Sequence, residues 1–194
     1  MLFTCWTRCG AMRKLTCALL CLLMILSTVF CLEGCKSREQ RLSEETAYED
    51  AQMKAMNKKV VKYINEKDKE GLKKLFSRSA QKDIEDLDGK IDEMLEAFKG
   101  ESIVSVKSEP VDSSRTYDYG KESISIYGEQ AFKLKDGKIY AVWIDFCDKD
   151  DNNKDNVGLY MIEVCKCSRE ELPEEFTWEG VNSGKPGIFI HYIN

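Results

Sequence analysis

Histidine and the common catalytic motifs are nearly missing from this sequence. His191 is the only histidine among 194 residues, and no two cysteines form a CxxC pair. Because zinc sites draw mainly on paired cysteines and histidines, the composition argues against a zinc site of that kind. The GxSxG, HExxH and P-loop patterns are absent as well. The sequence therefore predicts no cofactor and no catalytic residue.

The longest uncharged run lies near the amino terminus, at residues 15–32, and Arg13 and Lys14 precede it. A basic start, an apolar run and a small residue at the end are typical of a secretory signal peptide. The stretch LEGC that ends it, from Leu32 to Cys35, resembles the lipobox of bacterial lipoproteins. This resemblance implies cleavage between Gly34 and Cys35 and attachment of lipid, including palmitate, to Cys35.

An uncleaved transmembrane anchor is the alternative, because Glu33 departs from the usual lipobox and eighteen apolar residues just cross a bilayer core. The basic residues before the run would hold that end in the cytoplasm. In both cases the residues after Cys35 face outward, so we expect a protein of the cell membrane that is exposed outside the cytoplasm. Met12 offers a second start site to Met1.

Removal of the signal leaves an acidic domain with few cysteines. Of 29 basic and 34 acidic residues, 26 and 33 remain after residue 34, a net charge of −7. Such a domain is a poor nucleic acid binder. Of nine cysteines, three would remain free, which is not a disulfide framework: Cys147, Cys165 and Cys167.

Residues 44–194 predict one α+β domain, joined to Cys35 by a polar tether that ends at residue 43. Apolar residues at helical spacing predict three helices, which start near Ser43, Asp68 and Ile84, the last ending at Gly100. After Gly100 the apolar period becomes two, which predicts strands: residues 101–107, 121–134, 138–147 and 157–167. Helices followed by strands indicate helices packed on one face of an antiparallel sheet.

The turn at Lys135-Asp136-Gly137 allows a prediction of strand register. If Gly137 forms a bulge in the left-handed region, Phe132 and Leu134 share a face with four residues of the next strand: Tyr140, Val142, Ile144 and Phe146. A two-residue loop would instead place them beside Ala141 and Ile139. The bulged register gathers one apolar face, to which the last strand adds Tyr160, Ile162 and Val164.

The opposite face is less polar than a solvated face, with Asp145 and Glu163 among these residues: Ile139, Ala141, Trp143, Met161 and Cys165. Two interpretations stay open. A C-terminal segment with Phe176, Trp178, Ile188 and Ile190 covers this face, or the face binds a partner, such as a second copy in a homodimer.

The stretches KEGLKKLFS (69–77) and DNVGLY (155–160), in this order of elements, resemble the uncharacterised bacterial lipoproteins of domain of unknown function family 5104. The helices followed by a curved antiparallel sheet are similar to the nuclear transport factor 2-like, or SnoaL-like, cone fold. The resemblance implies a cone that encloses a pocket and frequent dimerisation through the sheet. Enzymatic members carry an Asp/His pair or Tyr and Asp groups inside the cone. Here Asp145 alternates away from the apolar face, and His191 lies near the chain end.

Two sets of polar residues are candidates for a site. The loop at 147–156 offers oxygen donors for calcium, Asp148, Asp150, Asp151 and Asp155, but the EF-hand positions for glycine and the last acid hold Asn153 and Leu159. A solvated hairpin loop is the simpler interpretation, so we predict no metal. The groups available for acid–base chemistry are Asp145, Glu163, Tyr117, Tyr119, Tyr127 and His191.

The sequence thus predicts a membrane-tethered, non-enzymatic domain that binds a small ligand, a cell-wall fragment or an envelope protein. The alternative is a SnoaL-like isomerase, dehydratase or hydrolase that uses a carboxylate in the cone. A polar pocket with a buried carboxylate would favour the enzyme, and a cone filled by Phe76, Phe98, Ile144 and Phe146 would count against it.

Overall fold

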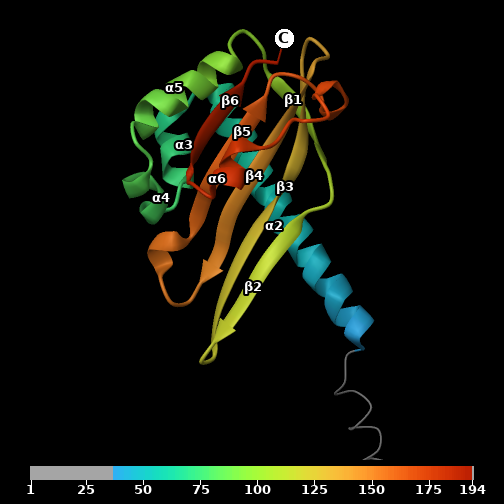
Figure 1. The fold of residues 1–194 in the computed structure, drawn as a ribbon, viewed down its shortest axis with the longest axis vertical. Helices are drawn as coiled ribbons and strands as arrows, with labels where there is room; N and C mark the ends of the chain where they lie inside the picture. Colours follow the sequence, from blue (N-terminus) through green and yellow to red (C-terminus); the bar gives the residue numbers. More distant parts are fainter. Residues whose placement is uncertain (1–36, 194) are drawn as a thin grey trace, which may run out of the picture. The chain divides into compact units, whose positions relative to one another are not determined.

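A computed structural model describes residues 37–193 of the chain (Figure 1). The predicted signal segment, the cleavage site at Gly34 and the lipidation site at Cys35 lie outside the described residues. The chain divides into two units, residues 1–45 and 46–194, and the fold below is that of the second. Within residues 37–193, none of the helices combines the length and the apolar character that a membrane span requires.

Among residues 37–193, four helices precede the sheet, one more than predicted for this part of the chain: α2 (Arg38–Glu66), α3 (Lys69–Leu75), α4 (Arg78–Asp83) and α5 (Leu87–Ala97). The additional helix, α4, forms because the Ser77 hydroxyl caps it, accepting a hydrogen bond from the Ala80 N–H at 3.1 Å. Asp86 caps α5 in the same way, so this helix begins after Asp86 and not at Ile84. The first helix begins at Arg38, before the predicted start at Ser43.

The sheet has six strands: β1 (Ile103–Ser108), β2 (Asp112–Asp118), β3 (Lys121–Leu134), β4 (Ile139–Asp150), β5 (Gly158–Cys165) and β6 (Gly187–His191). Their order is β1-β3-β4-β5-β6, and β2 pairs with β3 beyond the end of β1. The prediction of an antiparallel sheet was wrong in one strand, because β6 runs parallel to β5. The chain first passes through η2 (Arg169–Glu171) and α6 (Glu179–Ser183), the kind of crossover that a parallel neighbour requires. The result is an open, mixed sheet.

The β3–β4 hairpin has the predicted bulged register. Phe132 lies opposite Tyr140, and Gly137 has φ +94°, in the left-handed region that favours glycine. The backbone N–H of Leu134 donates to the Lys138 carbonyl at 2.8 Å and closes the loop. The apolar residues of both strands therefore share one face of the sheet.

The main core lies between this face and the helices. Met53 and Val60 of α2, together with Ile91 and Met94 of α5, are fully buried against it. Figure 1 shows α2 passing behind the sheet, on the side opposite α6. The four side chains predicted to fill this space are all buried: Phe76, Phe98, Ile144 and Phe146. This filling counts against a substrate pocket at the centre of the space between the helices and the sheet, and a cavity of about 380 Å³ lies at its edge, between α2 and β1.

A bulge in the β4–β5 pair changes the face of one predicted core residue. Ile144 pairs with Ile162, but Phe146 pairs with Leu159, and the register shifts between Asp145 and Phe146. Leu159 therefore enters the core and Tyr160 does not, because one extra residue reverses the alternation of side chains. The prediction that Tyr160 belongs to the apolar face was wrong.

The C-terminal segment covers part of the opposite face, as one of the two interpretations predicted. Trp178 packs with Ala141 and Cys165 in a second small core, and Phe176 joins it. Ile188 and Ile190 do not take part, because they lie on β6 and contact the main core. The covered area is therefore the end of the sheet near Trp143, and the other end stays open.

Candidate functional site

The open end of this second face holds a cavity of about 410 Å³. Strands β3, β4 and β5 form its floor, and α4 and η1 (Lys154–Asn156) form one wall. The residues that line it are mostly polar: Ser77, Ser79, Ala80, Asp83, Ser123, Ser125, Tyr127, Asp145, Cys147, Asp150, Asn156 and Tyr160.

Strand alternation brings the floor residues together. Ser125 and Tyr127 alternate with buried Ile124 and Ile126 along β3, so they point to the face away from the main core. Tyr127 lies directly opposite Asp145 on β4. Tyr160 reaches the same face from β5 through the bulge, and its hydroxyl donates to the Gly184 carbonyl at 2.7 Å. Asp145 therefore has a tyrosine on each neighbouring strand.

A close backbone contact brings the α4 wall to the sheet. The link between α3 and α4 pairs with β5 through Phe76 and Leu159, and the Ser77 N–H donates to the Leu159 carbonyl at 2.9 Å. Gly158 makes this approach possible, because a Cβ there would lie 2.8 Å from the Leu75 carbonyl oxygen. The Ser79 hydroxyl then bonds Asn156 Oδ1 at 2.8 Å and closes the wall.

The Asp145 carboxylate is the unusual group of this cavity. Within residues 37–193 it makes no hydrogen bond or ion pair, and its side chain is half-buried. Burial alone raises the pKa of Asp145 to about 6. A buried carboxylate normally has a partner, since desolvation without one costs stability. Asp145 is thus placed where the fold gains nothing from its charge.

Glu163, on the same face of the adjacent strand, shows the usual solution. Its carboxylate is fully buried and accepts the backbone N–H groups of Glu179 and Gly180 at 2.6 and 2.9 Å. Its Oε1 also lies 2.6 Å from Nε2 of His191, which donates to it. Glu163 and His191 thus fix α6 and β6 to the sheet. They are sequence candidates that the structure pairs, but in a structural role.

The four calcium candidates do not converge on one point. The Asp150 carboxylate accepts hydrogen bonds from Asn152, Asn153 and Asn156, at 2.8 to 2.9 Å, and holds its own loop. The others bind separate partners: Asp148 accepts from the Tyr48 hydroxyl, Asp151 pairs with Lys149 and Lys154, and Asp155 with Arg78 and Lys82. Over the described range, no three acidic, cysteine or histidine side chains form a group that could hold a metal ion.

The three tyrosine candidates from the sequence lie in two different places. Tyr127 lines the cavity, while Tyr117 and Tyr119 lie at the exposed β2–β3 turn, where Tyr119 is 100% exposed. Tyr119 has φ +47°, which the turn imposes on it. The two exposed tyrosines therefore take no part in the cavity around Asp145.

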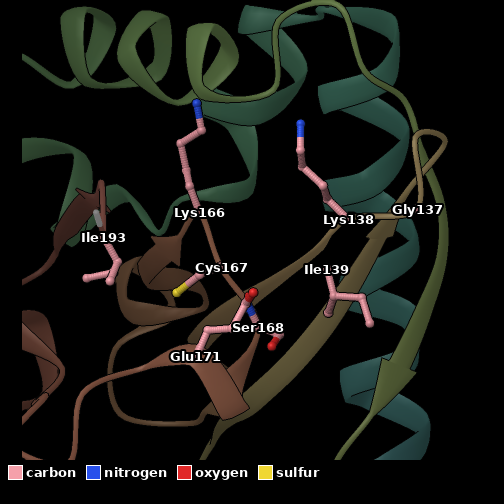
Figure 2. A pocket seen from close by; sticks show the side chains of 8 residues that line it. All are labelled: Gly137, Lys138, Ile139, Lys166, Cys167, Ser168, Glu171 and Ile193. Atoms are coloured by element: carbon pink, nitrogen blue, oxygen red, sulfur yellow. The ribbon is translucent and has the colours of Figure 1, made fainter.

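A second cavity, of about 560 Å³, lies near the β3–β4 hairpin and holds Cys167 together with two lysines. Figure 2 shows the side chains of Lys138 and Lys166 extending away from Cys167. Both ammonium groups have partners, because Lys138 pairs with Asp136 at 2.7 Å and Lys166 lies 4.9 Å from the centre of the Tyr192 ring. Since these charges are already matched, the Asp145 cavity is the stronger candidate.

Sequence reasoning missed three parts of this site. The serines of α4 were missed because that short helix has no apolar period of its own. Tyr160 was missed because of the bulge. Ser125 and Cys147 could have been found, since both alternate with the predicted core residues along β3 and β4 and must share the face of Asp145.

Comparison with known proteins gives a family but no activity. None of the curated proteins compared with the chain matches it. Residues 59–167, more than half of the chain, match the family model described as a domain of unknown function, DUF5104. These residues include the floor of the cavity and the α4 wall. The chain therefore belongs to the DUF5104 family.

Proposed function

We propose that this protein is an exported lipoprotein, anchored to the membrane through lipid on Cys35, whose domain binds a small polar ligand in the Asp145 cavity. The observation that carries the binding function is the bare carboxylate of Asp145. A residue kept for stability would be paired, as Glu163 is on the next strand. A desolvated group without a partner in a cavity is typical of a site that a ligand completes.

The cavity also has the mixed lining that small-molecule sites use. Two tyrosine rings supply apolar surface, and serine hydroxyls with the Asn156 amide supply hydrogen-bonding groups. The stack of Tyr127 on Trp143, with centroids 6.3 Å apart, holds one of these rings in place. A preformed wall of this kind lowers the cost of ordering when a ligand binds.

The finer fold assignment is part of the same proposal. Helices that pack on one face of a sheet, in this order along the chain, support a nuclear transport factor 2-like, or SnoaL-like, relationship. The ligand cavity that we propose lies on the other face, because aromatic and aliphatic side chains fill the centre of the space under the helices. A homodimer through the sheet stays a prediction, and Phe176 and Trp178 reduce the apolar area open to it.

An enzyme is the second candidate, and one observation favours it. A carboxyl group with a pKa of about 6 is suited to act as a general base near neutral pH. The cavity lining offers tyrosine and serine hydroxyls and the Cys147 thiol beside it. A binding protein would release its ligand unchanged, whereas an enzyme would convert it with a rate that follows the ionisation of Asp145.

The binding function is tested by ligand capture. The whole protein, purified in detergent, is incubated with small molecules from an envelope extract, and bound compounds are identified by mass spectrometry. We expect one or a few compounds on the wild type and their loss in Asp145→Asn, with retention in the control Asp92→Asn. Asp92 is exposed on α5, a helix that packs against the face of the sheet opposite the cavity. Equal capture by wild type and Asp145→Asn would refute the proposed site.

The anchor is tested by substitution of the lipidated residue. Cys35→Ala is expected to abolish incorporation of radiolabelled palmitate, because the thiol is the atom that lipid modifies, while Cys147→Ala should leave labelling unchanged. The mass of the mature wild-type chain should start at residue 35. Continued labelling of Cys35→Ala, or a mature protein that keeps residues 15–34, would reject the lipoprotein in favour of an uncleaved anchor.

A further inference from the structure

The charges of the Asp145 cavity indicate which ligand it would accept. Three carboxylates line it, and its complete lining contains no lysine, arginine or histidine. The loop satisfies Asp150 with hydrogen bonds, but Asp145 makes no ion pair, and neither does exposed Asp83 among the described residues. Building on the proposed function, we infer that the ligand is a small organic amine, bound through its ammonium group to the Asp145 carboxylate between Tyr127 and Tyr160.

The floor of the cavity places Asp145 between two tyrosines. Asp145 is on the middle strand, Tyr127 lies directly across from it on β3, and Tyr160 reaches the cavity from β5. The Tyr160 ring is held by its hydrogen bond to Gly184, and Tyr127 by its stack on Trp143. A cation held by a carboxylate between two aromatic rings gains both an ion pair and cation–π attraction.

The charged side chains that line the cavity are all acidic. Burial raises the pKa of Tyr160, and the negative charges of Asp145 and Asp83 raise it further. The Tyr160 hydroxyl therefore stays neutral near pH 7, and the negative charge of the cavity comes from its carboxylates. A phosphate or carboxylate ligand would meet only like charge in this cavity, and a neutral polyol would leave the Asp145 charge without a counter-ion.

The inference predicts a dependence on pH. The titratable groups that face Asp145 come from every neighbouring element: Asp83 of α4, Tyr127 of β3, Cys147 and Asp150 of β4, and Tyr160 of β5. Burial raises the pKa of the Cys147 thiol, so it stays neutral near pH 7. Amine affinity should therefore be highest between about pH 7 and the pKa of the amine, and it should fall below about pH 6, where Asp145 becomes protonated.

The test uses amines matched to neutral compounds of similar size. Ethanolamine is paired with ethylene glycol, putrescine with 1,4-butanediol, and glucosamine with N-acetylglucosamine. Binding to the whole protein in detergent is measured at pH 7.5 by calorimetry and by quenching of tryptophan fluorescence, to which Trp143 would contribute. We expect at least one amine to bind about tenfold or more tightly than its neutral partner. Asp145→Asn should remove this preference, and Asp92→Asn, on the other face of the sheet, should keep it.

Three outcomes would overturn the amine inference: equal binding of an amine and its neutral partner, amine binding that Asp145→Asn does not weaken, or no amine binding in the panel. The proposed function fails separately, through the capture experiment. If capture returns a neutral or anionic compound that Asp145→Asn loses, the cavity remains a binding site and only the amine assignment is wrong.

Discussion

Glu163→Ala is expected to lower the free energy of unfolding by about 3–5 kcal/mol, the range for breaking a buried, hydrogen-bonded charge. The substitution removes the acceptor for two backbone N–H groups and for His191. These donors would remain buried without partners, and α6 would lose its attachment to the sheet. Urea unfolding followed by circular dichroism measures the loss.

Two further variants make this prediction specific. Glu174→Ala removes an exposed glutamate of the same C-terminal segment and should change stability by less than about 0.5 kcal/mol. His191→Ala should cost less than Glu163→Ala, since Glu163 keeps its two backbone donors. A double-mutant cycle should give a coupling of about 0.5–3 kcal/mol between them. If the losses of stability in the two single variants add up in the double variant, the contact between Glu163 and His191 does not stabilise the protein.

Asp145→Asn is expected to act in the opposite direction and to stabilise the protein by about 1–3 kcal/mol at pH 7. The wild-type carboxylate is ionised and desolvated at this pH, with a pKa raised to about 6 in the folded protein. The amide has nearly the same shape and no charge, so the folded state no longer carries that cost. The gain is below the full electrostatic cost, because the amide also loses water. A stabilising substitution in a cavity is typical of a functional residue.

The pH dependence of this difference has a definite sign. The pKa of Asp145 in the folded state, about 6, is above the unfolded value of about 4. The folded state therefore binds this proton more tightly than the unfolded state does. The ionised Asp145 carboxylate therefore lowers the free energy of unfolding above pH 6, and this effect disappears below about pH 4. Thermal unfolding of wild type and Asp145→Asn should converge over this window, while Asp92→Asn should show no such convergence. Destabilisation by Asp145→Asn at pH 7 would indicate a stabilising partner for the carboxylate.

The register of the β3–β4 hairpin could be predicted from the local sequence pattern. The alternation of Phe132, Leu134 and Tyr140, together with the left-handed position at Gly137, was enough to choose the register that the structure has. Strand β2 was not predicted, because DSSRTYD has few apolar residues and is held by pairing with β3 along its whole length. Strand β6 was expected to cover the sheet, because five residues do not specify whether they pack on a sheet or pair with its edge.

The sequence by itself determined the α+β plan, the apolar face of β3 and β4, and the position of Asp145 on the other face. Only the tertiary structure decided that Glu163 is paired and that Asp145 is not. The reason is that these environments depend on the β4–β5 bulge and on the parallel docking of β6, which join residues far apart in the chain. A shift of one residue in such a pairing moves every following side chain to the other face. The local alternation of residues contains no information about that shift.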